Sequence, residues 1–86
     1  MITKITTVYD SKAKFYGRPL PTRTTEEAIR NFATIVNDPH SPYYPAPEDF
    51  TLFEMGTFDD ETAKLELHEN LIPISNGAEL VQKAES

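Results

Sequence analysis

The sequence predicts an α+β fold in which a small antiparallel sheet of about three strands, in the order β-α-β-β, carries one main helix on one face. Three features predict it: a β-branched stretch at the start, a capped amphipathic segment after it, and two alternating segments around an acidic turn. A short C-terminal helix or tail is expected to follow. The 86 residues are expected to form a single domain, 1–86.

The N-terminal part begins with a predicted strand. Residues 2–9 have the sequence ITKITTVY, which is rich in β-branched residues and lacks glycine and proline. Residues 10–13 form a predicted turn, because aspartate and serine side chains bond the local backbone. Residues 14–16 are expected to be a short extended piece. Residues 17–21 are expected to be a loop, because two prolines fix φ and remove hydrogen-bond donors.

The clearest helix signal comes next. Thr24 is a suitable N-cap, and Glu27 three residues later completes a capping box. Four apolar residues then recur at helical spacing and form one stripe: Ile29, Phe32, Ala33 and Val36. The helix is expected to end near residues 37–38, because Pro39 cannot continue it.

Residues 39–50 form a predicted proline-rich loop. Four prolines fall within nine residues, at positions 39, 42, 45 and 47, so the segment is expected to be irregular or polyproline-like. Tyr43 and Tyr44 are candidates to anchor the loop by packing on the domain. A loop of this length in a small domain is either functional or fixed onto the surface.

A β-hairpin is predicted in the acidic part of the chain. Its arms are residues 51–58 and 63–68, joined by the four residues 59–62. Gly56 interrupts the first arm, which indicates a bulge or a close backbone approach. Apolar and polar residues alternate in the second arm, which predicts one buried face (Ala63, Leu65, Leu67) and one exposed face (Lys64, Glu66, His68).

The C-terminal segment gives weaker signals. Residues 71–74 are a short apolar segment, and Ser75 or Asn76 is expected to cap a weak helix around residues 78–83. Residues 84–86 are expected to be a frayed tail.

Composition limits how this domain is stabilised. The chain has no cysteine, so neither a disulfide nor a thiolate metal site contributes. Oligomerisation is the usual remaining source of stability at this size, and we expect a homo-oligomer, with a dimer favoured. No apolar run approaches the roughly 20 residues of a membrane span, so we expect a soluble protein with no membrane partner.

The formal net charge of −6 is unevenly distributed along the chain. Residues 1–30 carry a net charge of +3, and residues 31–86 carry a net charge of −9. A local basic surface can bind nucleic acid even on an acidic protein, because salt screens charges beyond about 10 Å. The alternative is that the basic side chains are simply solvated. The six basic residues of the first part are Lys4, Lys12, Lys14, Arg18, Arg23 and Arg30.

The sequence shows no catalytic motif. It contains no phosphate-binding loop, dinucleotide fingerprint or nucleophile elbow. His40 and His68 are not at the spacing of helical metal ligands, so both are expected to be surface histidines. The carboxylates of residues 59–61 lack the calcium-loop pattern, and aspartate is a residue that tight turns select. We therefore expect no enzyme activity, no metal and no cofactor.

Three aromatic residues lie within the basic part of the chain: Tyr9, Phe15 and Tyr16. Basic residues interleaved with aromatic ones suit single-stranded nucleic acid, because bases stack on the rings while cations follow the phosphates. The alternative is that these rings build the core, since a small domain needs its aromatic residues there. The candidate nucleic-acid-binding set comprises these three aromatic residues and the six basic residues.

Several short strings together resemble a known phage family. In order they are VYDSKA at 8–13, AIRNF at 28–32, VNDP at 36–39, PEDFTLF at 47–53 and GTFDDET at 56–62. Their order and spacing resemble the small non-structural protein of gokushoviruses, which are single-stranded DNA phages of the microvirus group, over about residues 5–80. Many of those relatives have Thr-Gly after the double aspartate, where this chain has Thr62 and Ala63, which indicates a different hairpin turn here.

The resemblance implies a role in phage DNA synthesis in the cytoplasm of an infected bacterium, and it implies no catalytic residues. The first hypothesis is a non-enzymatic replication accessory that binds DNA, single-stranded DNA above all, and promotes single-strand genome synthesis or packaging. The alternative is a protein–protein adaptor that binds the phage replication initiator, a host replication factor or the procapsid through its acidic face.

Overall fold

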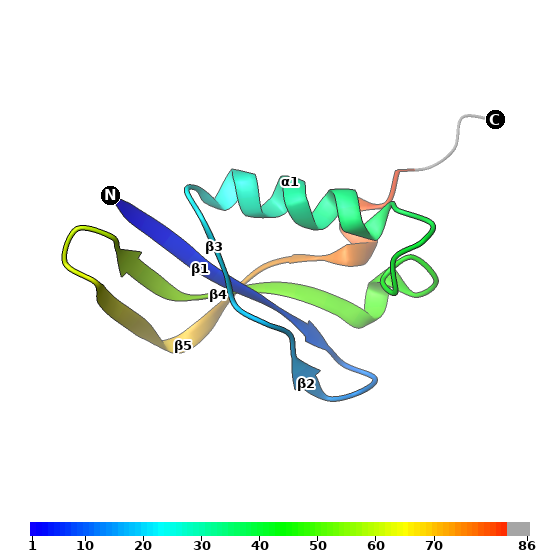
Figure 1. Cartoon of the computed structure of the whole chain (residues 1–86). Helices are drawn as coiled ribbons and strands as arrows, with labels where there is room; N and C mark the ends of the chain where they lie inside the picture. The colour runs from blue at the N-terminus through cyan, green and yellow to red at the C-terminus, as the bar shows by residue number, and fades with distance from the viewer. Residues whose placement is uncertain (83–86) are drawn as a thin grey trace.

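The sheet is organised around one central strand, β1 (Ile2–Asp10). The computed structural model describes residues 1–82. Along one edge β1 pairs over its whole length with β4 (Phe50–Asp59), whose far edge pairs with β5 (Lys64–Asn76). Along the other edge lie β2 (Phe15–Tyr16) and β3 (Leu20–Thr22), which share that side of β1 (Figure 1). Each of these pairings is antiparallel.

The predicted α+β class, with one helix across a face of an antiparallel sheet, is confirmed, but the predicted number of about three strands is wrong. The sheet has five strands. Strand β3 was not predicted, because residues 17–21 were expected to be a loop on account of their prolines. Pro21 pairs with Ile5 in this strand. An edge strand tolerates proline, since a missing N–H on its open side leaves no ladder hydrogen bond unmade.

Helix α1 (Thr25–Val36) supplies most of the core. The predicted N-cap is confirmed, because the Thr24 hydroxyl oxygen accepts a hydrogen bond from the N–H of Glu27 at 3.0 Å. The Glu27 carboxylate instead accepts from the N–H of Arg23 at 2.7 Å, one residue before the N-cap, so only half of the predicted capping box forms. The buried core consists of three helix residues and one from β4: Ala28, Phe32, Val36 and Leu52.

The proline-rich loop is held by one of its two tyrosines. The Tyr43 ring packs against Phe50, with ring centroids 4.3 Å apart, and against Phe32 at 5.9 Å. Burial, and secondarily the charge of Asp10, raises the pKa of Tyr43. Tyr44 stays 49% exposed, so the expectation that it also anchors the loop is wrong. The end of the loop, Pro47–Asp49, is a 3₁₀ turn, η1.

The strand β5 is longer and more irregular than the predicted hairpin arm. It continues through residues 71–74, which were predicted to be a separate apolar segment. Its register with β4 shifts between the pairs Glu54–Ile72 and Gly56–Leu67. A Cβ atom on Gly56 would collide with the carbonyl oxygen of Glu66, so the predicted close backbone approach at this glycine is confirmed.

The predicted burial pattern of the second hairpin arm is wrong. Leu65 and Leu67, expected to be buried, are 56% and 61% exposed. His68, expected to be exposed, is intermediate in burial. The core lies under α1 against the middle of the sheet, and no element of residues 1–82 buries Leu65 and Leu67.

The C-terminal helix is a single 3₁₀ turn, η2 (Gly77–Leu80), shorter than predicted. The predicted cap at Asn76 is confirmed: its side chain accepts from the N–H of Ala78 at 2.9 Å, and its own N–H donates to Glu79. The side-chain amide of Asn37 donates to the carbonyl of Leu80 at 2.9 Å, which ties η2 to the end of α1. Lys83 and the predicted tail, 84–86, lie outside the described residues.

The two hairpin turns have the same backbone conformation at their last residue. Lys14 ends the β1–β2 turn at φ 63°, and Ala63 ends the β4–β5 turn at φ 62°. The N–H of each donates to the carbonyl of an aspartate four residues earlier, Asp10 or Asp59, at 2.7 Å. Both residues therefore adopt the left-handed conformation that favours glycine.

Replacing Ala63 by glycine (A63G) is expected to stabilise the protein by about 0.5–1 kcal/mol, because relief of the left-handed strain exceeds the extra entropy of the unfolded chain. The measurement is the midpoint of urea unfolding at an unchanged m-value. The control is A13G in the other turn, since Ala13 has no positive φ and should lose stability. Equal destabilisation by both variants would contradict the strain argument.

Candidate nucleic-acid interface

The β1–β2 hairpin brings part of the predicted site together. Tyr9 pairs with Tyr16 across the two strands, with ring centroids 4.6 Å apart. Phe15 is 61% exposed, and Lys12 and Lys14 are exposed in the turn between the strands. Arg18 lies two residues after the end of β2 and is also exposed. We refer to these residues as the hairpin cluster: Tyr9, Lys12, Lys14, Phe15, Tyr16 and Arg18.

Local hydrogen bonds hold the turn in place. The Asp10 carboxylate accepts from the N–H groups of Lys12 and Ala13 at 3.0 and 3.1 Å, as the turn prediction required. Ser11 donates its N–H and its hydroxyl to the carbonyl of Asp49, at 2.9 and 3.1 Å. These contacts attach the turn to η1, so the two lysines project from an ordered backbone.

The aromatic residues of the hairpin cluster do not all face the same way. Tyr16 packs edge-on against Phe53, at 6.0 Å between centroids, on the sheet face away from α1. Phe15 lines a hollow with Pro42 and Tyr43, on the side of the proline-rich loop. Each exposed ring can therefore stack on a different base, whereas Tyr9, partly covered by Tyr16, serves mainly to support that ring.

Arg18 lies beside a groove under the helix. The groove has a volume of about 310 Å³ and lies between α1 and the β3 edge of the sheet. The N–H of Gly17 donates to the carbonyl of Val8, and the Thr7 hydroxyl donates to the carbonyl of Gly17, both at 2.8 Å. The segment carrying Arg18 is thus fixed to β1, and its guanidinium adds a third cation to the two lysines.

The other three basic residues lie outside the hairpin, and two of them lie at the far end of β1. Lys4 lies six residues before Asp10 on β1, which corresponds to about 20 Å along an extended strand. Arg23 follows Thr22, the β3 residue that pairs with Lys4, and is therefore at the same end of the sheet. Arg30 is exposed on α1. For Lys4 and Arg23, a separation of this size exceeds the Debye length of about 10 Å, so these two charges act independently of the hairpin cluster.

Lys4 forms an ion pair with the buried carboxylate of Glu54, which the sequence analysis did not predict. Glu54 is only 8% exposed, and its Oε2 lies 2.7 Å from Nε2 of His68. Its Oε1 lies 3.9 Å from Nζ of Lys4. Partners of this kind are required because a buried carboxylate without compensation is strongly destabilising. The only sequence signal is a glutamate at a core-facing position of a strand, and its partners depend on the register of three strands.

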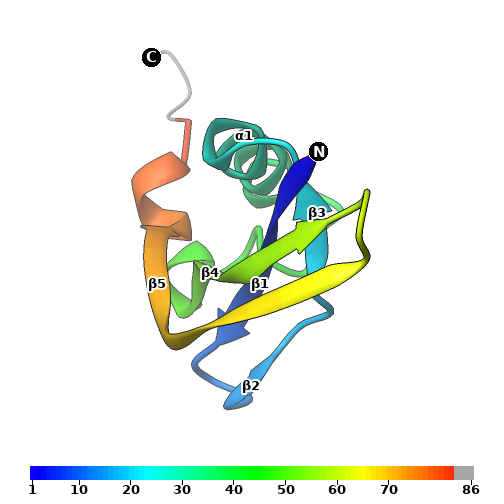
Figure 2. The same cartoon turned by 90° about the vertical axis from the view of Figure 1, so that its left-hand side faces the viewer.

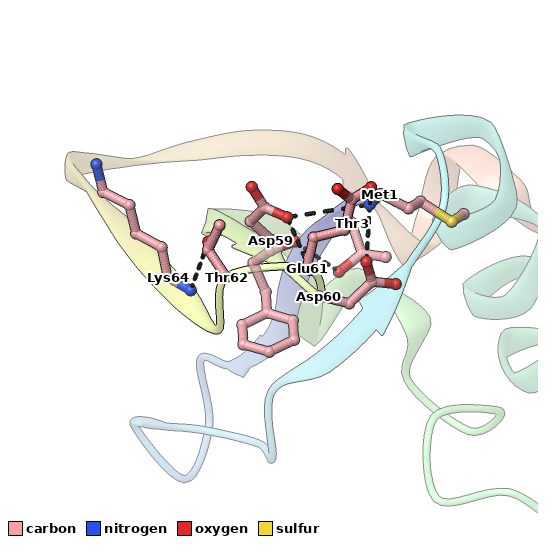
Figure 3. A network of polar contacts seen from close by, with 8 residues as sticks. Met1, Thr3, Asp59, Asp60, Glu61, Thr62 and Lys64 are labelled. Carbon is pink, nitrogen blue, oxygen red and sulfur yellow. Dashed lines mark hydrogen bonds and ion pairs between the residues drawn. The ribbon is translucent and has the colours of Figure 1, made fainter.

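The acidic turn lies at the other end of the molecule from the hairpin cluster (Figure 1). Asp60 and Glu61 contact the Met1 ammonium at 2.7 and 3.1 Å, and Asp59 lies 3.9 Å from it (Figure 3). The hydrogen bonds that the ammonium donates to Asp60 and then to Glu61 raise its pKa above 8.0. Among residues 1–82, no cluster of three or more histidine and acidic side chains is arranged to hold a metal ion.

Comparison with known proteins identifies the family. A family model described as Phage ORF5 protein matches residues 3–80. The chain belongs to this phage protein family. Searches of curated proteins and of solved structures each give no significant match. None of the helices in the described part of the chain has the length and apolar character needed to cross a membrane.

Because Glu54 and His68 are in contact, the effects on stability of replacing each of them are expected to be non-additive. Replacing either residue by alanine (E54A or H68A) should lower the free energy of unfolding by about 1–3 kcal/mol. H68A leaves the buried carboxylate without its histidine partner, and E54A removes the group that both His68 and Lys4 contact. The double variant should cost less than the sum of the two by about 1 kcal/mol or more. Urea unfolding of the four proteins measures this coupling, and strict additivity would show that the contact contributes nothing.

The Met1 ammonium is expected to make stability depend on alkaline pH. Because its pKa is raised in the folded chain, its contribution is fully present below 8.0 and is lost as pH rises through the raised value. The variant D60N should bring the pKa back toward 8.0. An NMR titration of the amino group checks this, with E79Q as the control. An equal pKa in D60N and the parent chain would exclude the contact.

Proposed function

We propose that this phage protein is a non-enzymatic replication accessory of the gokushovirus type. In this proposal it binds DNA, single-stranded DNA above all, and promotes single-strand genome synthesis or packaging in the cytoplasm of the host bacterium. The hairpin cluster is the observation that carries the proposal. It joins three exposed cations to two exposed aromatic rings on one ordered hairpin. We assign no catalytic residue, metal or cofactor.

Charge on the hairpin is available for phosphates. Lys12, Lys14 and Arg18 take part in none of the ion pairs formed within residues 1–82. Asp10 and Asp49 are the nearest acidic residues by backbone contact, and Oδ1 of Asp10 accepts hydrogen bonds from two backbone N–H groups of the turn. Phosphates of a single strand can therefore be matched by three unpaired cations.

The acidic β4–β5 turn is too far away to cancel this local charge. Ile2 pairs with Asp59 and Asp10 pairs with Phe50, so the acidic turn and the basic turn lie at opposite ends of β1. Eight residues of extended strand separate them by about 26 Å. This is more than two Debye lengths at moderate salt, so the charge of the acidic turn does not prevent a polyanion from approaching the hairpin.

The aromatic rings favour single-stranded over duplex DNA. Bases in a duplex are stacked on one another, whereas those of a single strand can stack on protein side chains. Tyr16 and Phe15 are 49% and 61% exposed on two sides of the hairpin. A strand that passes over the turn can thus place one base on each ring while its phosphates meet the lysines.

The triple variant K12A/K14A/R18A is expected to weaken binding of single-stranded DNA by about tenfold or more at low salt. It should also lower the slope of log affinity against log salt by about 2, because three phosphate contacts are lost. Fluorescence anisotropy at several salt concentrations measures both. The matched control is K4A/R23A/R30A, which removes the same charge outside the hairpin cluster and should have a smaller effect.

Stacking is tested by F15A and Y16A. Each should cost about 1–3 kcal/mol in single-strand affinity and leave duplex affinity nearly unchanged. Thermal unfolding checks that the variants fold. No binding by the parent protein at low salt, or equal losses in the hairpin and control triples, would rule out the hairpin as the DNA site.

The second candidate function is a protein–protein adaptor that acts through the acidic face. The supporting observation is the β4–β5 turn, where the side chains of Asp60 and Glu61 are 51% and 81% exposed. A pull-down from infected cells after nuclease treatment tests it. Recovery of a replication protein or procapsid by the parent chain but not by D60N/E61Q supports this function, and equal recovery by both contradicts it.

A further inference from the structure

The two edges of the sheet are not equally protected against pairing with another strand. The edge formed by β2 and β3 is short, is interrupted between the two strands, and contains Pro21. Short edge strands and proline are common ways to prevent pairing between sheets. At the other edge, residues 64–67 of β5 pair in continuous register with β4 and contain no proline. Within the described chain no strand pairs with the open side of β5 (Figure 2).

The side chains of this open edge are divided between two faces. Leu65 pairs with Phe58 and Leu67 with Gly56, on the face away from the buried core. Lys64 and Glu66 alternate with them on the opposite face, where their charged groups are 3.7 Å apart and about two thirds exposed. Two large exposed leucines on an unpaired edge form an interaction surface that a single copy leaves in water.

We propose that β5 pairs antiparallel with β5 of a second copy of this chain, around a two-fold axis at Leu65. In this register Leu65 lies opposite the partner's Leu65, and Leu67 lies opposite the partner's Ala63. Lys64 then lies opposite the partner's Glu66, and Glu66 opposite the partner's Lys64. The edge is self-complementary, because one two-fold operation brings leucine to leucine and each charge to its opposite.

Neighbouring registers are excluded by the same side chains. A shift by one residue would place leucines opposite charged residues on the wrong face. A two-fold axis at Glu66 would place that carboxylate opposite the partner's Glu66, which is repulsive. An axis at Leu67 would require the irregular part of β5 where the register shifts, and an axis at Ala63 would put the left-handed turn residue at the centre of the pairing rather than at its end.

The small core explains why such an interface would be useful. Among residues 1–82, only four hydrophobic residues are buried in one copy. About three residues of each β5 strand, 64–66, would pair with one another, so the interface is smaller than the roughly 1,600 Å² of stable complexes. The dimer is therefore expected to be a weak one that dissociates at low micromolar concentration. This inference does not depend on DNA binding, and it is tested without DNA.

The experiment is sedimentation equilibrium of the full chain from about 10 µM to about 1 mM. The parent protein should approach twice its monomer mass with rising concentration. The variants K64E and E66K should each remain monomeric, because like charges then face one another across the axis. A mixture of K64E with E66K should form a heterodimer, and the double variant K64E/E66K should dimerise again.

The charge exchange separates this interface from a general charge effect. The control K12E has the same net charge as K64E but lies in the β1–β2 turn, so it should dimerise like the parent protein. Circular dichroism and thermal unfolding check that each variant folds. A parent protein that stays monomeric up to the highest concentration would overturn the proposal. So would a parent dimer that both single reversals leave intact, or two monomeric variants that fail to associate when mixed.

Discussion

The antiparallel ladder between β1 and β4 is the constraint on which the rest of the structure depends. It runs the full length of β1, from the pair Ile2–Asp59 to the pair Asp10–Phe50. This register puts Val8 and Leu52 on the face that α1 covers, and it puts Glu54 on that same face. It also sends the two turns in opposite directions, so that the acidic turn and the basic turn cannot meet. The acidic β4–β5 turn and the basic β1–β2 turn are thereby kept apart in space.

Elements with local signals were predictable from the sequence. The cap at Thr24, the helix end before Pro39, the aspartate-led turns and the close approach at Gly56 each rest on contacts within a few residues or on backbone sterics. The strand β3 was missed because proline is usually evidence against a strand, and only the position at an edge makes it acceptable. The exposure of Leu65 was missed because alternation shows that two faces differ but cannot show which face another element covers.

The candidate site was predictable in part for the same reason. Lys12, Lys14, Phe15 and Tyr16 are neighbours in the sequence, and a hairpin keeps them neighbours in space. Lys4 belongs to the same basic stretch, yet its ammonium faces the buried Glu54 on a strand 50 residues later in the chain. Contacts of that range follow from the sheet register, which composition and local pattern do not determine. Residues that are close in sequence therefore stay close in the folded chain, whereas the net charge of residues 1–30 does not show which of their side chains share a surface.

The proposed dimer would place these charges in a particular order. Residues 64–67 adjoin the acidic turn, so the two acidic turns would lie near the two-fold axis and the two hairpin clusters at the distal ends. Each cluster stays about 26 Å along β1 from that acidic region. A short oligonucleotide would reach only one cluster and would bind a dimer no better than a monomer. A long single strand could reach both, and its second contact would be intramolecular, which raises the apparent affinity without any new contact. A weak interface at the acidic end would thus favour binding of long single strands, such as a phage genome.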